Sequence, residues 1–154
     1  MLNLDQADMR ILSALQENSR IGLEALSEVA SLSVASVQRR LKHLRDSQVI
    51  VKDIAIVNPE KVGQPMSFIV MVELERERPD QIDAFTQLAM SDVQVQQCYY
   101  ITGEADFCLI CTSADMKEFE ALTHRLFFNN NNVRRFKTSV VMGRKKVSLS
   151  VDVS

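Results

Sequence analysis

The stretch "LSVASVQRRLKHLRDSQVI", residues 32–50, decides the fold of the first third of this chain. Ser33 is a suitable N-cap, because its hydroxyl can accept a bond from the first amides of a helix. When the following residues are wound at about 100° each, the apolar side chains Val34, Val37, Leu41 and Leu44 fall on one narrow arc. The opposite arc carries Ala35, Ser36, Arg39 and His43, with Arg40 and Lys42 on its flanks. The stretch therefore predicts an amphipathic helix with a basic outer face.

Two shorter helical patterns precede this helix. "LDQADMRILSAL", residues 4–15, begins with Asp5 as an N-cap for the amide of Asp8, and "LEALSEVA", residues 23–30, repeats apolar residues at helical spacing. After the third helix, "VIVKDIAIV", residues 49–57, alternates as a small β-wing does. Three short helices and a wing in this order are typical of a winged helix-turn-helix, whose third helix enters the major groove of DNA.

The charge of the chain is placed unevenly. The net charge is −2, but residues 33–52 hold five cations against Asp46 alone, which is a local charge of +4. A basic helix face is often merely solvated, yet the two preceding helices and the scarcity of acids on the outer face favour DNA binding. The residues predicted to contact DNA are Ser33, Ala35, Ser36, Arg39, Arg40, Lys42 and His43.

The rest of the chain has a different pattern. "NPEKVGQP", residues 58–65, is a linker rich in proline and glycine. Strands are predicted over residues 66–75, 93–102, 107–113 and 133–143, and helices over 79–90 and 115–128. The order β-α-β-β-α-β is typical of a ferredoxin-like sandwich, with both helices on one face of an antiparallel sheet.

The tail "KKVSLSVDV", residues 145–153, alternates again and is expected to add an edge strand or to cross to a partner. We therefore expect an α+β chain with a DNA-binding domain at 1–57, a linker at 58–65 and a second domain at 66–154.

Several classes of protein are disfavoured by composition. No apolar run reaches the ~20 residues that span a bilayer and the N-terminus is no signal peptide, so a cytoplasmic protein without a membrane partner is expected. Cys108 and Cys111 form a Cys-x-x-Cys pair, but in a strand side chains three apart point to opposite faces. Neither a disulfide nor a metal site is expected, and no cofactor.

The short stretch "TGEAD", residues 102–106, joins two of the predicted strands and has two interpretations. It can be a plain hairpin turn, in which Gly103 supplies a positive φ. It can also hold a free amino acid, because a glycine turn exposes amide donors for a carboxylate, and Glu104 or Asp106 can accept from an ammonium group.

At this point the chain resembles the Lrp/AsnC, or feast/famine, family of transcription regulators. The resemblance lies in "LDQADMRILSALQENSRI", "LSVASVQRRLKHLRDSQVI", "VNPEKVG" and "YYITGEADFCLIC", in that order over nearly the whole length. It implies a winged helix-turn-helix followed by a ferredoxin-like effector domain of the ACT-like, or RAM, type. It also implies dimers that assemble into octamers on double-stranded DNA, with a free amino acid bound between dimers.

The resemblance also implies an effector site. Polar contacts are carried over to Thr102, Gly103 and Asp106, with Tyr100 and Glu104 beside them. Wall positions are carried over to Met116, Ser139, Val140 and Val141. Because the wall is mostly apolar, the ligand is expected to be leucine or methionine.

Two departures from the family pattern carry expectations of their own. Where the family has a glycine before the wing, this chain has Ser47 and Gln48, one of which would bear strain in a left-handed conformation. Where the family has a leucine-proline-glycine turn, residues 129–132 are all asparagine, which tolerates left-handed turns.

Other functions remain open. An enzyme would need a general base with a partner, and neither His43 nor His124 has one in the pattern, so an enzyme is not expected. The alternatives to a promoter-specific regulator are an amino-acid-sensing oligomer and a DNA-architectural protein.

Overall fold

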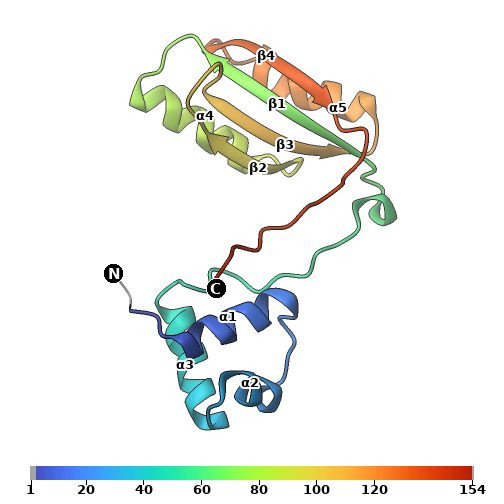
Figure 1. Ribbon diagram of the computed structural model, residues 1–154. Coiled ribbons are helices and arrows are strands. Elements are labelled where there is room, and N and C mark those ends of the chain that lie inside the picture. Colours follow the sequence, from blue (N-terminus) through green and yellow to red (C-terminus); the bar gives the residue numbers. More distant parts are fainter. Residues whose placement is uncertain (1–2, 154) are drawn as a thin grey trace. The chain divides into compact units, whose positions relative to one another are not determined.

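The structure, a computed structural model, describes residues 3–153 and consists of two compact units (Figure 1). The chain up to Ile56, together with the chain from Lys146 onward, forms the first unit, and Val57–Lys145 forms the second. The sequence placed the last segment in the second domain, whereas in the structure it packs with the first. The outermost positions of the expected domains, 1–2 and 154, lie outside the described residues.

The first unit contains three helices, α1 (Gln6–Glu17), α2 (Leu23–Ala30) and α3 (Val34–Asp46). The predicted caps are confirmed: Asp8 N donates to Asp5 Oδ1 at 2.9 Å and Asp5 N donates to Asp8 Oδ2 at 3.1 Å, which completes a capping box. Ser33 likewise accepts from the amide of Ser36. The core consists of Ile11, Leu12, Leu26, Ala30, Val37, Leu41 and Leu44. Val34, predicted to face this core, is 39% exposed because it lies in the first turn of its helix.

The predicted β-wing is not formed. Residues 51–58 have no regular structure, and the side chain of Ile56 is 84% exposed. The tail expected to form an edge strand is also without a strand. Polar and apolar residues alternate in both segments, as they do in strands. A β-strand also needs a neighbouring strand whose backbone supplies the hydrogen-bond partners.

The tail is held by other contacts. The side-chain amide of Gln16 donates to Val151 O at 2.9 Å and accepts from Val151 N at 2.8 Å. Val153 packs against the core of the three helices. The tail up to Val153 is therefore part of the first unit.

The second unit has the predicted βαββαβ order. Its elements are η1 (Pro59–Val62), β1 (Met66–Leu74), α4 (Pro79–Ser91), β2 (Val95–Tyr100), β3 (Phe107–Ser113), α5 (Met116–Thr123), the π-helical turn η2 (His124–Phe128) and β4 (Val133–Val140). The sheet order is β2-β3-β1-β4 and every neighbouring pair is antiparallel (Figure 1). The expected ferredoxin-like α+β sandwich is confirmed.

One face of this sheet carries both helices. Phe68 of β1 stacks on Phe119 of α5 with ring centroids 3.7 Å apart, and Phe85 of α4 contacts Phe107 of β3 at 4.7 Å. The opposite face, here called the open face, has no helix on it and includes Ser67, Ile69, Met71, Glu73, Cys108, Ile110, Arg135, Lys137 and Ser139. As predicted for "CLIC", Cys111 lies in the core and Cys108 on the open face.

The two departures from the family pattern have different outcomes. Gln48 has a φ of 58°, so the expected left-handed residue before the absent wing is confirmed. The described residues with positive φ include none of the four asparagines, so the turn before β4 is formed without a left-handed asparagine. Asn132 instead pairs with Arg76, accepting from its amide and donating to its carbonyl, both at 3.1 Å, which extends the pairing of β1 and β4.

Candidate functional site

The outer face of α3 is the first candidate site. Ala35, Arg39, Lys42 and His43 are exposed, and Ser36 is half-buried. Ser33 is exposed, but its hydroxyl caps the helix. The arc predicted from periodicity is therefore presented to the surface, with small residues in the first turn and cations beyond it. This distribution suits a helix that inserts its N-terminal end into a groove and contacts phosphates further along.

Arg40 differs from the other predicted DNA contacts. Its guanidinium lies against Asp5 and Asp8 at the start of α1, with N–O distances of 2.8 Å to each. Hydrogen bonding to Asp5 raises the pKa of Arg40, and hydrogen bonding to Arg40 lowers the pKa of Asp5. Sequence reasoning placed Arg40 on the flank of the DNA face, whereas the structure turns its side chain toward α1.

The remaining cations have different partners. Lys42 pairs with Asp46 one turn along the same helix, and Arg45 pairs with Asp53 at 3.3 Å. Within residues 3–153, Arg39 has no ion pair. Exposed ion pairs are weak, so Lys42 can exchange its carboxylate for a phosphate, while Arg39 needs no exchange.

The turn between β2 and β3 is the second candidate site. Thr102, Gly103 and Glu104 are exposed, and Gly103 has a φ of 125°. A Cβ at Gly103 would meet nothing within 4 Å, so the backbone conformation and not crowding calls for glycine. The amide and hydroxyl groups of this turn are open to a ligand.

Asp106 has a structural role in this turn. Its Oδ2 accepts from the amide of Leu74 at 2.6 Å, where the β1–β4 register shifts. Its backbone amide donates to Val72 O at 2.9 Å, and its carbonyl accepts from Ile101 N at 2.8 Å. Asp106 thus joins the turn to the end of β1, and Oδ2 is already engaged in that bond.

The predicted wall residues lie elsewhere on the sheet. Met116 begins α5 and is 53% exposed, and Ser139, Val140 and Val141 end β4. Val140 pairs with Phe68 of β1, whereas the turn is next to Phe107, which pairs with Val72. Four residues of strand, or about 13 Å, separate these levels. Tyr100 contacts Phe107 with ring centroids 5.3 Å apart and belongs with the turn. The structure places the turn at one end of the sheet and the wall positions at the other end, where Ser139 lies on the open face and Val140 on the face that carries the helices.

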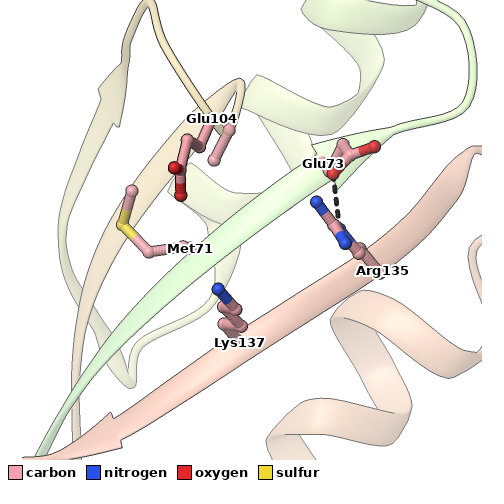
Figure 2. Close-up of a pocket in the computed structure, with 6 residues that line it drawn as sticks. Met71, Glu73, Glu104, Arg135 and Lys137 are labelled. Atoms are coloured by element: carbon pink, nitrogen blue, oxygen red, sulfur yellow. Dashed lines mark hydrogen bonds and ion pairs between the residues drawn. The ribbon is translucent and has the colours of Figure 1, made fainter.

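A small pocket on the open face includes one residue of the turn. It has a volume of about 140 Å³ and is lined by Met71, Glu73, Glu104, Ala105, Arg135 and Lys137. Figure 2 shows Lys137 and Glu104 pointing into it, while Arg135 is paired with Glu73. Sequence reasoning missed these strand residues, although their alternate positions on two strands could have placed them on one face. Because carboxylate and cationic side chains both line this pocket, it suits a small polar or zwitterionic group.

No cluster of three or more His, Cys, Asp or Glu side chains suitable for a metal ion occurs within residues 3–153. None of the described helices is both long enough and apolar enough to cross a bilayer.

Known proteins match both units. The AsnC-type helix-turn-helix domain matches residues 4–45, and the Lrp/AsnC ligand binding domain matches residues 67–151. The chain is 45% identical to a helix-turn-helix-type transcriptional regulator of Sinorhizobium fredii, over 99% of this chain and 90% of that protein. It is 32% identical to the leucine-responsive regulatory protein of Haemophilus influenzae, over 93% and 86% of the two chains.

A solved structure agrees with these matches. The complex of a transcriptional regulator from Neisseria meningitidis with L-methionine superposes with a TM-score of 0.90 at 29% identity, covering 98% of this chain and 97% of that one. Together with the exposed basic face of α3 and the ferredoxin-like second unit, these matches identify the chain as a DNA-binding transcriptional regulator of the Lrp/AsnC family.

Proposed function

We propose that this regulator responds to a free amino acid with an apolar side chain, leucine or methionine. In this proposal, the β2–β3 turn of one copy and the α5–β4 end of another copy together form the effector site. The observation that carries the proposal is the exposed turn of residues 102–104, whose backbone and hydroxyl groups are open to a ligand.

The chemistry of the turn suits the polar end of an amino acid. The Thr102 hydroxyl and the amides around Gly103 can donate to a carboxylate, and Glu104 can accept from an ammonium group. Oδ2 of Asp106 accepts from the amide of Leu74, and in the proposal its other carboxylate oxygen serves as a second acceptor for the ammonium group. A charged acceptor and neutral donors at one turn match a zwitterion better than they match a plain anion.

The apolar end of the ligand needs a different surface. Met116 lines a shallow groove together with Phe119, Phe128 and Phe136, and Val140 is exposed at the end of β4. Since the turn lies at the opposite end of the sheet, one copy cannot enclose both ends of the ligand. This separation supports a site made by two copies, and such a site would couple ligand binding to assembly.

The relatives support this proposal. One of them is named leucine-responsive, and one neighbour was solved with L-methionine. In the proposed assembly, dimers form through the open faces of the sheets and associate into octamers. Several recognition helices then contact one DNA molecule, which raises the avidity of the assembly.

The test is calorimetric titration of the purified full-length chain with each proteinogenic amino acid, together with DNA affinity with and without ligand. Leucine or methionine should bind, and binding should weaken in Glu104→Gln and in Met116→Ser. Met90→Ser, another exposed methionine, is the matched control and should bind as the parent does. Asp106 is unsuitable for this purpose because its substitution would also disturb the fold.

Three outcomes would contradict the proposal. Binding of arginine or aspartate with no binding of leucine or methionine would assign a different ligand class. No binding of any amino acid would favour a DNA-architectural protein, which should also bind a selected and a scrambled DNA fragment equally. An amino-acid-sensing oligomer would bind the ligand and show no affinity for DNA.

A further inference from the structure

We infer that Arg40 is a positioning residue for DNA recognition, which orients α3 through α1 and does not itself contact phosphate. Its neighbour Arg39 is the phosphate-binding member of the pair. The inference depends on DNA binding by the chain and not on which effector it binds.

The contacts of Arg40 engage both terminal nitrogens of its guanidinium. Nη1 donates to Asp5 Oδ1 and to Asp8 Oδ1, both at 2.8 Å, and Nη2 lies 2.8 Å from Asp5 Oδ2. This two-pronged pairing with Asp5 has the geometry in which arginine binds a carboxylate most strongly. The Arg40 side chain is 28% exposed and that of Asp8 only 12%, whereas that of Asp5 is 54% exposed, so the Arg40–Asp8 side of the cluster is the part withdrawn from solvent.

The same two carboxylates also form the capping box of α1. Asp5 Oδ1 accepts from Asp8 N, and Asp8 Oδ2 accepts from Asp5 N. Arg40 therefore joins the middle of α3 to the first turn of α1 through groups whose own positions are fixed by backbone bonds. Apolar packing of Leu41 and Leu44 holds α3 against the core but depends little on the orientation of the helix. The hydrogen bonds of Arg40 depend strongly on orientation, because hydrogen bonds are directional.

The local charge argues against a phosphate at Arg40. Two carboxylates lie within 2.8 Å of one guanidinium, so the cluster as a whole carries a net negative charge. A phosphate that approached Arg40 would meet two like charges and would have to displace well-formed bonds. Arg39 is exposed, follows the outer arc and has no ion pair within the described residues.

The two roles predict opposite effects of Asp8→Asn. If Arg40 binds phosphate, loss of the nearby carboxylate frees Arg40 and removes a negative charge, so DNA affinity rises. If Arg40 positions α3, the same change loosens the link to α1, and affinity for a specific sequence falls. Asp8→Asn keeps the size of the side chain and leaves every cation of α3 in place.

The experiment uses the full-length protein and a DNA fragment that it selects from a random-sequence pool. Affinity for this fragment and for a scrambled one is measured at several salt concentrations. For Arg40→Ala and for Asp8→Asn we expect the preference for the selected fragment to fall by about tenfold or more. The affinity for scrambled DNA and the slope of log affinity against log salt should stay near the parent values.

Arg39→Ala is the matched control, since it removes the same side chain one position earlier. It should weaken binding to both fragments and reduce the salt slope by about one. Circular dichroism of each variant reports whether the helices remain, and Asp5→Asn provides a second, milder change if Arg40→Ala does not fold. A salt slope reduced by Arg40→Ala, or tighter DNA binding by Asp8→Asn, would overturn the inference.

Discussion

Gln48 lies at the end of α3 in the left-handed region of the backbone, with a φ of 58°. Its amide donates to Arg45 O at 3.0 Å, so the conformation is held by the helix end. A side chain with a Cβ costs about 1 kcal/mol in this region, and glycine avoids most of that cost. We expect Gln48→Gly to raise the free energy of unfolding by roughly 0.5–1 kcal/mol.

Urea unfolding of the full-length chain measures this effect. Gln48→Ala is the control, because alanine keeps the Cβ and should bring no gain. A glycine variant no more stable than the parent would show that the left-handed position carries no strain.

Cys111 illustrates how burial changes the chemistry of a thiol. Burial in the core raises its pKa from 9.0 to about 12. In the unfolded chain the thiol ionises near 9.0, so above that pH the unfolded state loses a proton that the folded state retains. Stability contributed by the neutral thiol is complete below pH 9 and declines toward pH 12, by up to about 1.4 kcal/mol per pH unit.

The check compares the parent with Cys111→Val by urea unfolding between pH 8 and pH 11, an interval that starts below the ordinary thiol pKa of 9.0 and ends below the raised pKa of about 12. The parent should lose stability with pH more steeply than the variant, whose side chain does not ionise. In addition, thiol-labelling reagents should modify Cys111 only after denaturation. Parallel pH profiles for the two proteins would contradict the burial effect.

At the scale of elements, the end of β1 is held to the β2–β3 turn by a side chain. Asp106 accepts from the amide of Leu74 at the register shift, where the ladder with β4 is interrupted. Removal of the carboxylate leaves this half-buried amide without its partner. We expect Asp106→Ala to lower the free energy of unfolding by roughly 1–3 kcal/mol.

Asp106→Asn keeps an acceptor oxygen and should lose less stability than Asp106→Ala. Glu104→Gln, an exposed change two residues earlier, is the control and should stay within about 0.5 kcal/mol of the parent. If Asp106→Ala were as stable as Glu104→Gln, the bond to Leu74 would contribute nothing to the free energy of unfolding. Asp106 would then be free to act as a ligand contact alone.

At the scale of the whole molecule, two segments from opposite ends of the chain make up the DNA-binding unit. Its first residues form the three helices, and its last residues return after the second unit, with Val153 against the helical core and Gln16 bonded to Val151. The helix-turn-helix of this protein therefore includes residues that a sequence-based boundary assigns to the effector domain.

Two valines of the tail test this arrangement. Val153→Ala removes partly buried methyl groups and should lower the stability of the first unit by roughly 0.5–1 kcal/mol. Val147→Ala makes the same chemical change at a position that is 61% exposed, and should have little effect. Hydrogen exchange of the α1 amides measures the local stability. Equal exchange in both variants would mean that the tail does not support the helices.

The sequence by itself determined the features that depend on near neighbours. The helices of the first unit, the Asp5 and Ser33 caps, the βαββαβ order and the divergence of the two cysteines of "CLIC" all follow from periods of two or 3.6 residues and from bonds spanning three or four residues. The exposed face of α3 and the glycine turn follow from the same local rules. Most of the candidate site could therefore be located without coordinates.

Only the tertiary structure decided which side chains are free to act. Arg40 and Arg39 are adjacent cations in the sequence, but Arg40 meets carboxylates 32 and 35 positions away, and Arg39 stays open. Asp106 meets the amide of Leu74 at a separation of 32, and the wall residues lie at the far end of the sheet from the turn. The alternating segments 49–57 and 145–153, also expected to be strands, have no ladder partner among the described residues. Partners distant in sequence depend on how elements pack, and a local pattern carries no information about that packing.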